Sequence, residues 1–340
     1  TVTSGELPIG ATCAINETGT GGAVPEVNPD KVVVGATPGP VTVTVTNTYA
    51  VGALELRKAV DDGGTGTIPL GTEFTLRVVC EYPSDYPVDG RIPGFNPLDV
   101  TVPSGVGGAP GAPVTVGLGG LPAGNDGLPV GSTCTVSEPD PQGATFVDIL
   151  PPQPVTITDD LDSPVEVVVT NTYPVGGGEV VKVTDGVLAP EFAPEGSAFE
   201  VEVTCVYPDG FPVSGPIFGY NPLTKTISAG PPGQPGTPAP FGDVPLGSEC
   251  TVVETTDGGA TDVDISPDQP IIITDEQTPV RVNVTNSFDA AGLQITKVVS
   301  GEGGGLVPPD LVYTARVLCF FDGTDGPELI FDEEIDFGVG

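Results

Sequence analysis

Three stretches of the chain share one nine-residue pattern: VTVTVTNTY at 41–49, VEVVVTNTY at 165–173 and VRVNVTNSF at 280–288. In each stretch valine alternates with mostly polar residues, which is the period of a β-strand that buries one face. Asn47, Asn171 and Asn286 stand on the valine face of their strands. Near-identical strands at such wide spacing indicate tandem copies of one β domain.

Two further motifs recur in the same phase. LPIGATCAINE at 7–17 returns as LPVGSTCTVSE at 128–138 and as VPLGSECTVVE at 244–254. A lysine recurs at 58, 182 and 297, and both the lysines and the asparagines are spaced by 124 and 115 residues. A repeat of this length is the usual size of a domain.

The repeat predicts two complete domains and two incomplete ones. The complete domains occupy 50–174 and 175–288, whereas 1–49 is the back part of a preceding domain and 289–340 the front part of a following one. Either the sequence is a window on a longer array, which we favour, or neighbouring chains complete each other's terminal halves.

Composition excludes several classes of protein. The chain has 46 acidic and 10 basic residues, a net charge of −36, and no histidine, methionine or tryptophan. Without histidine there is no Ser-His or Cys-His nucleophile pair and no His-liganded metal. So few basic residues cannot form a phosphate-binding face, and an acidic surface is repelled by anionic lipid. We expect no cofactor, no metal, no nucleic-acid partner and no membrane insertion.

Glycine and proline are abundant, with 49 and 40 copies in 340 residues. This content can accompany disorder, but the hydrophobic residues fall in short valine-rich runs bounded by turn formers. The sequence therefore predicts an all-β fold.

Six cysteines at wide, regular spacing indicate structural disulfides and an oxidising compartment. The alternation of Phe199, Val201 and Val203 with acidic and polar residues places Cys205 on an inward face, and Cys80, Cys134 and Cys250 stand in equivalent positions. This supports the pairs Cys80–Cys134 and Cys205–Cys250. Cys13 and Cys319 then have partners in the two incomplete domains. Buried free thiols are the alternative.

Each complete repeat also places one lysine, one glutamate and one asparagine on inward positions. The lysines are Lys58 and Lys182, the glutamates Glu138 and Glu254, and the asparagines Asn171 and Asn286. An unpaired buried charge costs several kcal/mol. Three of the five lysines nevertheless share this phase, which solvated lysines have no reason to do.

These motifs resemble the CnaB domains, the B-type repeats of Gram-positive collagen adhesins and pilins, and in particular their disulfide-containing actinobacterial relatives. The family usually has an aromatic residue where CTVSE and CTVVE have cysteine. The resemblance implies a tandem array of immunoglobulin-like β-sandwiches in which a lysine and an asparagine form an isopeptide bond with the help of a glutamate. It assigns Lys58–Asn171 with Glu138 and Lys182–Asn286 with Glu254. Glu17, Asn47 and Lys297 belong to the incomplete domains.

The expected function is structural: an adhesin stalk or filament at the cell surface or cell wall, and not an enzyme. Its expected partners are neighbouring domains, other copies of the chain or a host or cell-surface ligand. A self-assembling sheath is an alternative, and so is a Lys–Glu ion pair capped by Asn without covalent chemistry. A ligand- or calcium-binding module is another, with candidate oxygens on Asp61, Asp62, Asp159, Asp160 and Asp162.

Overall fold

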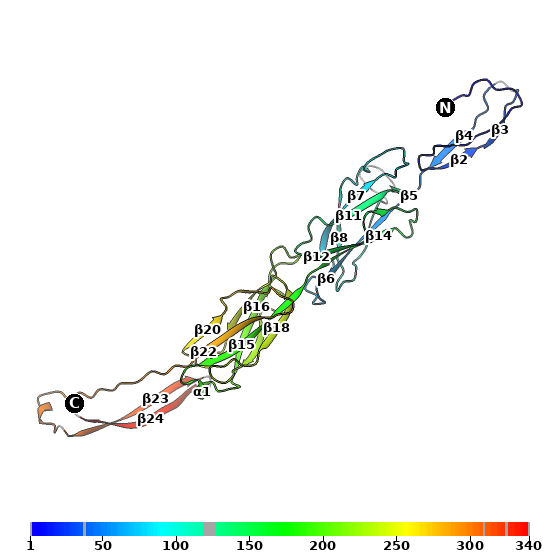
Figure 1. Ribbon diagram of the computed structural model, residues 1–340. Helices are drawn as coiled ribbons and strands as arrows, with labels where there is room; N and C mark the ends of the chain where they lie inside the picture. Colours follow the sequence, from blue (N-terminus) through cyan, green and yellow to red (C-terminus); the bar gives the residue numbers. More distant parts are fainter. Residues whose placement is uncertain (1, 37–38, 118–126, 309, 324–325, 339–340) are drawn as a thin grey trace. The chain divides into compact units, whose positions relative to one another are not determined.

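The computed structural model describes residues 2–36, 39–117, 127–308, 310–323 and 326–338 (Figure 1). The described residues are almost entirely strand and loop, with one short α-helix, α1 (Ala189–Phe192), and one 3-10 turn at Gly304–Leu306. This confirms the all-β prediction. The chain forms two compact units, Thr1–Pro174 with Gly210–Pro212, and Val175–Asp209 with Val213–Gly340. Within the described parts, neither helix has the length and apolar character needed to cross a membrane.

Two four-stranded sheets form the main body of the first unit. One has the order β12-β14-β6-β9 and the other β13-β11-β7-β8. The strands are β6 (Leu54–Asp61), β7 (Glu73–Glu81), β8 (Leu98–Pro103), β9 (Val114–Val116), β11 (Thr133–Ser137), β12 (Phe146–Leu150), β13 (Val155–Thr156) and β14 (Val165–Thr172). Two short strands, β5 (Val51–Gly52) and β10 (Leu128–Pro129), pair with each other in a separate two-stranded sheet.

The two sheets share one apolar core, because their strands alternate inward and outward residues. Leu54 and Leu56 of β6, Leu76 of β7 and Val167 and Val169 of β14 are fully buried in the same cluster. Burying one such side chain contributes about 1.5–3 kcal/mol. The sheets are therefore the two layers of a β-sandwich.

The second unit repeats this plan with the sheets β18-β15-β22-β20 and β17-β16-β19-β21. The strands are β15 (Val175–Asp185), β16 (Ala198–Val206), β17 (Leu223–Ser228), β18 (Ala239–Pro245), β19 (Glu249–Glu254), β20 (Asp262–Ser266), β21 (Ile271–Ile272) and β22 (Val280–Ser287). In both units the first long strand lies parallel to the last one: β6 beside β14, and β15 beside β22. Among the strand ladders of the described residues, these two are the parallel ones.

A buried disulfide joins two neighbouring strands in each unit. Cys80 of β7 and Cys134 of β11 are direct partners in the ladder and are bonded, as are Cys205 of β16 and Cys250 of β19. The bonds close 54 and 45 residues of chain. Loops of this length correspond to about 4 kcal/mol of stability from chain entropy.

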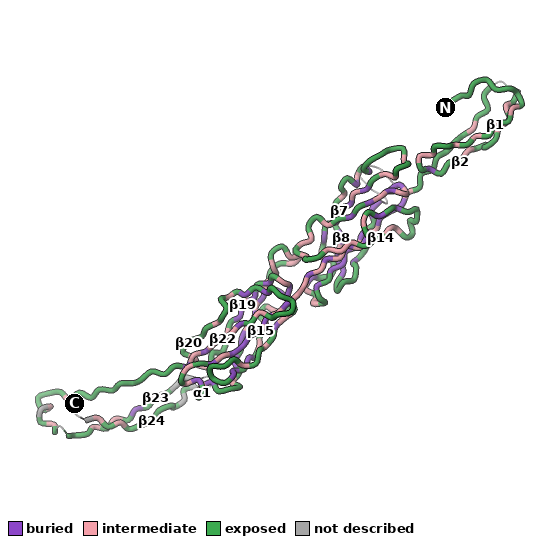
Figure 2. Tube along the Cα trace, viewed as in Figure 1, coloured by how far each residue is buried: buried purple, intermediate pink, exposed green. Residues whose placement is uncertain are grey.

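The two ends of the chain are less buried than these sheets (Figure 2). Residues 2–49 form two separate pairs, β1 (Thr12–Ala14) with β3 (Lys31–Val33) and β2 (Val24–Asn28) with β4 (Thr44–Thr48). Near the other end, β23 (Val312–Gly323) pairs with β24 (Gly326–Gly338). Residues 290–300, whose sequence predicts a strand, are extended without strand partners. In the two complete repeats the equivalent strand pairs with the last strand of the repeat, and the described residues from 289 to 338 contain no such partner strand.

Candidate functional site

The parallel pairing of first and last strands places the repeated lysine and asparagine on one face of one sheet. Lys58 of β6 lies opposite Val169 of β14, and Asn171 follows two residues later on the same face. Lys182 of β15 lies opposite Val284 of β22, with Asn286 two residues further on. The geometry of the first site is thus repeated in the second.

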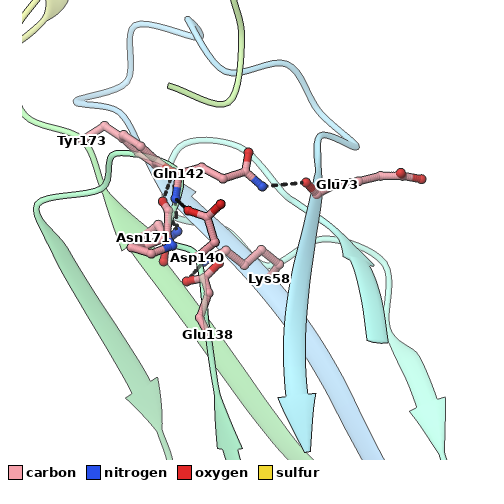
Figure 3. A network of polar contacts seen from close by, with 8 residues as sticks. Lys58, Glu73, Glu138, Asp140, Gln142, Asn171 and Tyr173 are labelled. Carbon is pink, nitrogen blue, oxygen red and sulfur yellow. Dashed lines mark hydrogen bonds and ion pairs between the residues drawn. The ribbon is translucent and has the colours of Figure 1, made fainter. Parts of the chain in front are cut away.

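The repeated glutamate reaches this point from the facing sheet. Glu138 directly follows β11, and Glu254 is the last residue of β19. An oxygen of Glu138 lies 3.3 Å from the Lys58 ammonium nitrogen Nζ, and an oxygen of Glu254 lies 2.6 Å from Lys182 Nζ. Figure 3 shows the side chains of Lys58, Glu138 and Asn171 close together.

All six side chains are enclosed. The two lysines and the two asparagines are 0% exposed, and the side chains of Glu138 and Glu254 are 1% and 3% exposed. At such burial the loss of hydration competes with the attraction between the charges. Burial therefore favours the uncharged forms of the lysine and glutamate more strongly in these sites than it does for an ion pair at the protein surface.

Burial shifts the pKa of the two lysines and the pKa of Glu138 in opposite directions. It lowers the pKa of Lys58 from 10.5 to about 8, although Glu138 opposes the change. It raises the pKa of Glu138, which Lys58 and Asn171 oppose. Burial also lowers the pKa of Lys182, against the effect of Glu254. Each shift lowers the free-energy cost of transferring a proton from the lysine ammonium to the glutamate carboxylate.

An aromatic ring completes the lysine environment, and the sequence analysis did not identify it. Nζ of Lys58 lies 4.8 Å from the centre of the Phe74 ring, and Nζ of Lys182 lies 4.3 Å from that of Phe199. A ring face attracts a cation and excludes water. The signal was present in the sequence, because an aromatic residue stands 16 or 17 positions after each repeated lysine.

The asparagine amide is oriented by the backbone of the loop that follows the glutamate. Asn171 Nδ2 donates to the carbonyl oxygen of Pro141 at 3.2 Å, and Asn286 Nδ2 donates to that of Asp257 at 2.8 Å. The loop positions are equivalent, so the hydrogen bond repeats although the residue types differ. These carbonyls carry no side-chain signature, which is why sequence reasoning missed them.

With the amide nitrogen held in this way, two oxygens in each site lack a donor. Asn171 Oδ1 and Glu138 Oε1 are buried and accept no hydrogen bond from any described residue, and the same is true of Asn286 Oδ1 and Glu254 Oε2. A buried acceptor without a donor costs about 1–3 kcal/mol. A carboxylic acid, unlike a carboxylate, carries a proton that it can donate to an amide oxygen.

Comparison with known families identifies the repeat. A family model described as "Domain of unknown function (DUF5979)" matches residues 1–50, 54–174 and 179–289. The chain belongs to this family. Its second and third DUF5979 segments each contain one complete set of lysine, glutamate and asparagine, and the first contains Glu17 and Asn47.

Several solved structures are similar to this DUF5979 chain at low sequence identity. The major pilin protein T-13 of Streptococcus pyogenes aligns with 70% of this chain and 97% of its own length, at 11% identity and a TM-score of 0.30. Two B repeat units of the collagen binding protein of Staphylococcus aureus align with 78% of this chain and 55% of their own length, at 13% identity and a TM-score of 0.22.

A third solved structure is an adhesin from Mobiluncus mulieris that contains intramolecular disulfide, isopeptide and ester bond cross-links. It aligns with 71% of this chain and 99% of its own length, at 10% identity and a TM-score of 0.24. Among curated protein sequences, none matches the DUF5979 chain.

The incomplete parts of the DUF5979 chain hold the remaining predicted residues. Asn47 Nδ2 donates to Glu17 Oε1 at 3.0 Å, and Nζ of Lys297 lies 4.6 Å from the centre of the Tyr313 ring. Cys13 and Cys319 are free thiols that are partly exposed. The structure thus pairs the glutamate with the asparagine at one end of the chain, and the lysine with its ring at the other.

Two of the candidate calcium-binding aspartates accept hydrogen bonds within local turns. One Asp62 oxygen accepts hydrogen bonds from the backbone of Ile68 and the hydroxyl of Thr67, both at 3.3 Å. One Asp160 oxygen accepts from the backbone of Asp162 and Ser163. Within the described ranges, no three cysteine, aspartate or glutamate side chains are grouped as a metal site requires.

Proposed function

We propose that each complete unit cross-links itself through an amide between the repeated lysine and asparagine, and that the chain is a structural stalk or filament of the cell surface. The observation that carries the proposal is the pair of donor-less oxygens on Glu138 and Asn171 beside a fully buried Lys58. A charged lysine and carboxylate leave those oxygens unsatisfied. A neutral amine and a carboxylic acid satisfy them.

The reaction starts with proton transfer from the lysine ammonium to the glutamate. The amine formed is the nucleophile, and the protonated glutamate donates a hydrogen bond to asparagine Oδ1 and polarises its carbonyl. The bond from Nζ to Cγ forms and the bond from Cγ to Nδ2 breaks. Glutamate relays the proton that the amine loses to the leaving nitrogen, so ammonia departs and the glutamate stays protonated with the proton that it first took from the lysine ammonium.

The product suits the site better than the reactants do. A buried charged pair is replaced by a neutral amide, which removes the cost of desolvating two charges. The reaction happens once in each unit and has no external substrate, so it is a self-modification and not enzymatic turnover.

The position of the bond suits a load-bearing role. Asn171 in the last strand of one unit is followed by Lys182 in the first strand of the next, 11 residues later. Tension applied to the chain ends enters and leaves each unit through its first and last long strands. An amide from Lys58 to Asn171 in the first unit, and from Lys182 to Asn286 in the second, joins these two strands and carries the tension. The disulfides support an oxidising, extracellular location.

Stretching single molecules from their ends tests this function. Asn171 follows Lys58 by 113 residues, a segment of roughly 380 Å when extended, which the cross-link keeps from unravelling. We expect no such lengthening from either complete unit of the native chain. In the double variant Glu138→Ala and Glu254→Ala the disulfides still close loops of 54 and 45 residues. Each unit is therefore expected to lengthen by roughly 200 Å, about half of the fully extended length. Full unravelling of the native units under reducing conditions would refute the proposal.

A further inference from the structure

The strand that leads to the glutamate loses one of its two neighbours before the glutamate is reached. β11 pairs with β7 from Thr133 to Ser137, but it pairs with β13 only at Thr133 and Cys134. Glu138 stands four residues beyond Cys134. In the second unit β19 likewise pairs with β21 only at its first two residues, four residues before its glutamate. Strand pairing on this side therefore does not extend to the carboxyl that takes part in the proposed reaction.

A glutamine side chain continues this side of the strand where the short strand stops. The backbone N–H of Val136 donates to Oε1 of Gln153 at 3.0 Å, and that of Val252 donates to Oε1 of Gln269 at 3.0 Å. Continued by two residues, the registers with β13 and β21 place Gln153 opposite Val136 and Gln269 opposite Val252. In both units a side-chain carbonyl thus takes the place that a backbone carbonyl has in an antiparallel ladder.

The glutamine amide is itself held in one orientation. Nε2 of Gln153 donates to the carbonyl oxygen of Pro151 at 2.9 Å, and Nε2 of Gln269 donates to that of Pro267 at 2.8 Å. Because the nitrogen is engaged by the glutamine's own loop, the oxygen is directed at the strand. The amide is therefore fixed at both of its polar atoms in each unit.

The first copy of the motif satisfies the same N–H in a different way. Its equivalent residue is Ile15, whose N–H donates to the backbone carbonyl of Asp30 at 2.9 Å. In the complete units the donors are enclosed, since Val136 and Val252 are 2% and 1% exposed. A buried donor that loses its acceptor costs more than an ordinary hydrogen bond contributes. The acceptor is thus present in all three copies, and glutamine provides it in the two that hold a complete site.

The bonded N–H lies close to the reacting carboxyl along the strand. Val136 and Glu138 are two residues apart and share the inward face. Cys134, two residues before Val136, is held by its disulfide, and an oxygen of Glu138 lies 3.3 Å from Lys58 Nζ. Between these two points the glutamine supplies the hydrogen bond on the side without a strand neighbour. A misplacement of about 1 Å in reacting groups can slow a reaction by about 100-fold.

We propose that Gln153 and Gln269 are positioning residues for the cross-linking reaction. Each holds the end of its glutamate strand so that the carboxyl of Glu138 or Glu254 meets both the lysine amine and the asparagine carbonyl. Each acts through the strand backbone, at the N–H two residues before the glutamate. This role rests on the proposed function, because it concerns the rate at which the same bond forms.

The rate of cross-linking in freshly synthesised chains tests this role. The full chain is made by cell-free synthesis and quenched in denaturant at intervals, and the ammonia loss of each unit is read from the masses of its fragments. Gln153→Met keeps the side-chain length but lacks the acceptor, so the first unit is expected to react about tenfold more slowly while the second keeps its native rate. Gln269→Met is expected to reverse this pattern. Gln277→Met, which replaces an exposed glutamine of the second unit, is the matched control.

A conservative variant separates positioning from packing. Gln153→Glu keeps an acceptor oxygen at the same reach, so it is expected to restore the rate of the first unit to within about threefold of the native rate. Thiol labelling is expected to show Cys80 and Cys134 still bonded in both variants of Gln153, as in the native chain.

Four results overturn the inference. A native rate in Gln153→Met refutes the positioning role and leaves the proposed function intact. A rate in Gln153→Glu as low as in Gln153→Met assigns the slowing to something other than the acceptor. Slowing accompanied by reactive thiols at Cys80 and Cys134 assigns it to loss of the fold. A native chain that loses no ammonia refutes the proposed function itself, and the positioning role with it.

Discussion

Two regions of this chain have almost the same sequence and very different surroundings. VEVVVTNTY at 165–173 lies between two strands, and its Val169 and Asn171 are 0% exposed. VTVTVTNTY at 41–49 has one partner strand, its Val45 is 43% exposed, and Asn47 is exposed as well. The motif therefore does not determine its own burial. The neighbouring lysine strand and the facing sheet do.

The hydrogen bonds of the asparagine differ accordingly. In the closed site the amide nitrogen of Asn171 donates to a backbone carbonyl, and Glu138 faces Lys58. In the open region the amide nitrogen of Asn47 donates to Glu17. The lysine strand thus supplies both the buried lysine and part of the enclosure that lowers its pKa.

The largest effect is expected when the closed site loses its glutamate. Glu138→Ala removes the proton carrier, so the first unit is expected to keep its ammonia while the second still loses one. A cross-link that spans about 100 residues is worth about 4.7 kcal/mol by chain entropy, so the free energy of unfolding of the first unit is expected to fall by about that amount. Denaturant unfolding and intact mass measure the two effects. Glu73→Ala, which replaces an exposed acid in β7, is the control. If the free energy of unfolding fell equally in both variants, the role assigned to Glu138 would be contradicted.

Removing a disulfide is expected to have the next largest effect. Replacing Cys80 and Cys134 together by alanine releases a loop of 54 residues and is expected to cost about 4 kcal/mol. Cys13→Ala in the open region removes a partly exposed free thiol and is expected to change stability by less than about 0.5 kcal/mol. Thermal unfolding of the two variants compares them. Similar melting temperatures would show that the disulfide adds nothing to the closed region.

The pH dependence of stability is expected to expose the buried lysine once the bond is blocked. In Asn171→Ala, Lys58 remains unbonded with a pKa near 8, against 10.5 in the unfolded chain. Between these values the unfolded chain keeps the proton and the folded unit does not, so unfolding takes up a proton and stability rises with pH, by up to about 3 kcal/mol. The raised pKa of Glu138 acts oppositely, lowering stability as pH rises from 4.5 until the folded carboxyl ionises.

A second substitution isolates the contribution of the lysine. The double variant Lys58→Met and Asn171→Ala lacks the titrating amine, so the rise between pH 8 and 10.5 is expected to disappear in urea unfolding at each pH. A rise of equal size in both variants would assign it to another group.

The smallest effect is expected from a tyrosine hydroxyl that the first closed site contains and the second lacks. Tyr173 donates its hydroxyl to the Pro141 carbonyl at 2.9 Å and lies 3.5 Å from Asn171 Nδ2, whereas Phe288 occupies this position in the second unit. Tyr173→Phe is expected to lower stability by about 0.5–1.5 kcal/mol and leave the bond intact. Intact mass shows whether the bond has formed, and denaturant unfolding measures the change in stability. Loss of the bond in this variant would show that the tyrosine takes part in the reaction.

The sequence predicted the strands and the inward phase of the lysine, glutamate and asparagine, because repetition shows which positions are held constant. It did not show the carbonyls of Pro141 and Asp257 or the orientation of the amides, since backbone groups have no residue signature. The rings of Phe74 and Phe199 were detectable but lie far from the lysines in sequence. Residues 290–300 have a strand pattern but form no strand. Strand formation there depends on a partner strand and not on the local pattern alone.

The intact mass of the reduced, unfolded chain tests the two cross-links most directly. We predict a mass below that of the sequence by two ammonia molecules, with Lys58 joined to Asn171 and Lys182 joined to Asn286 in the peptide fragments. Replacing Asn171 and Asn286 by alanine is expected to abolish both losses. A native chain with the full mass of its sequence would contradict the account and leave the buried lysines and glutamates as ion pairs.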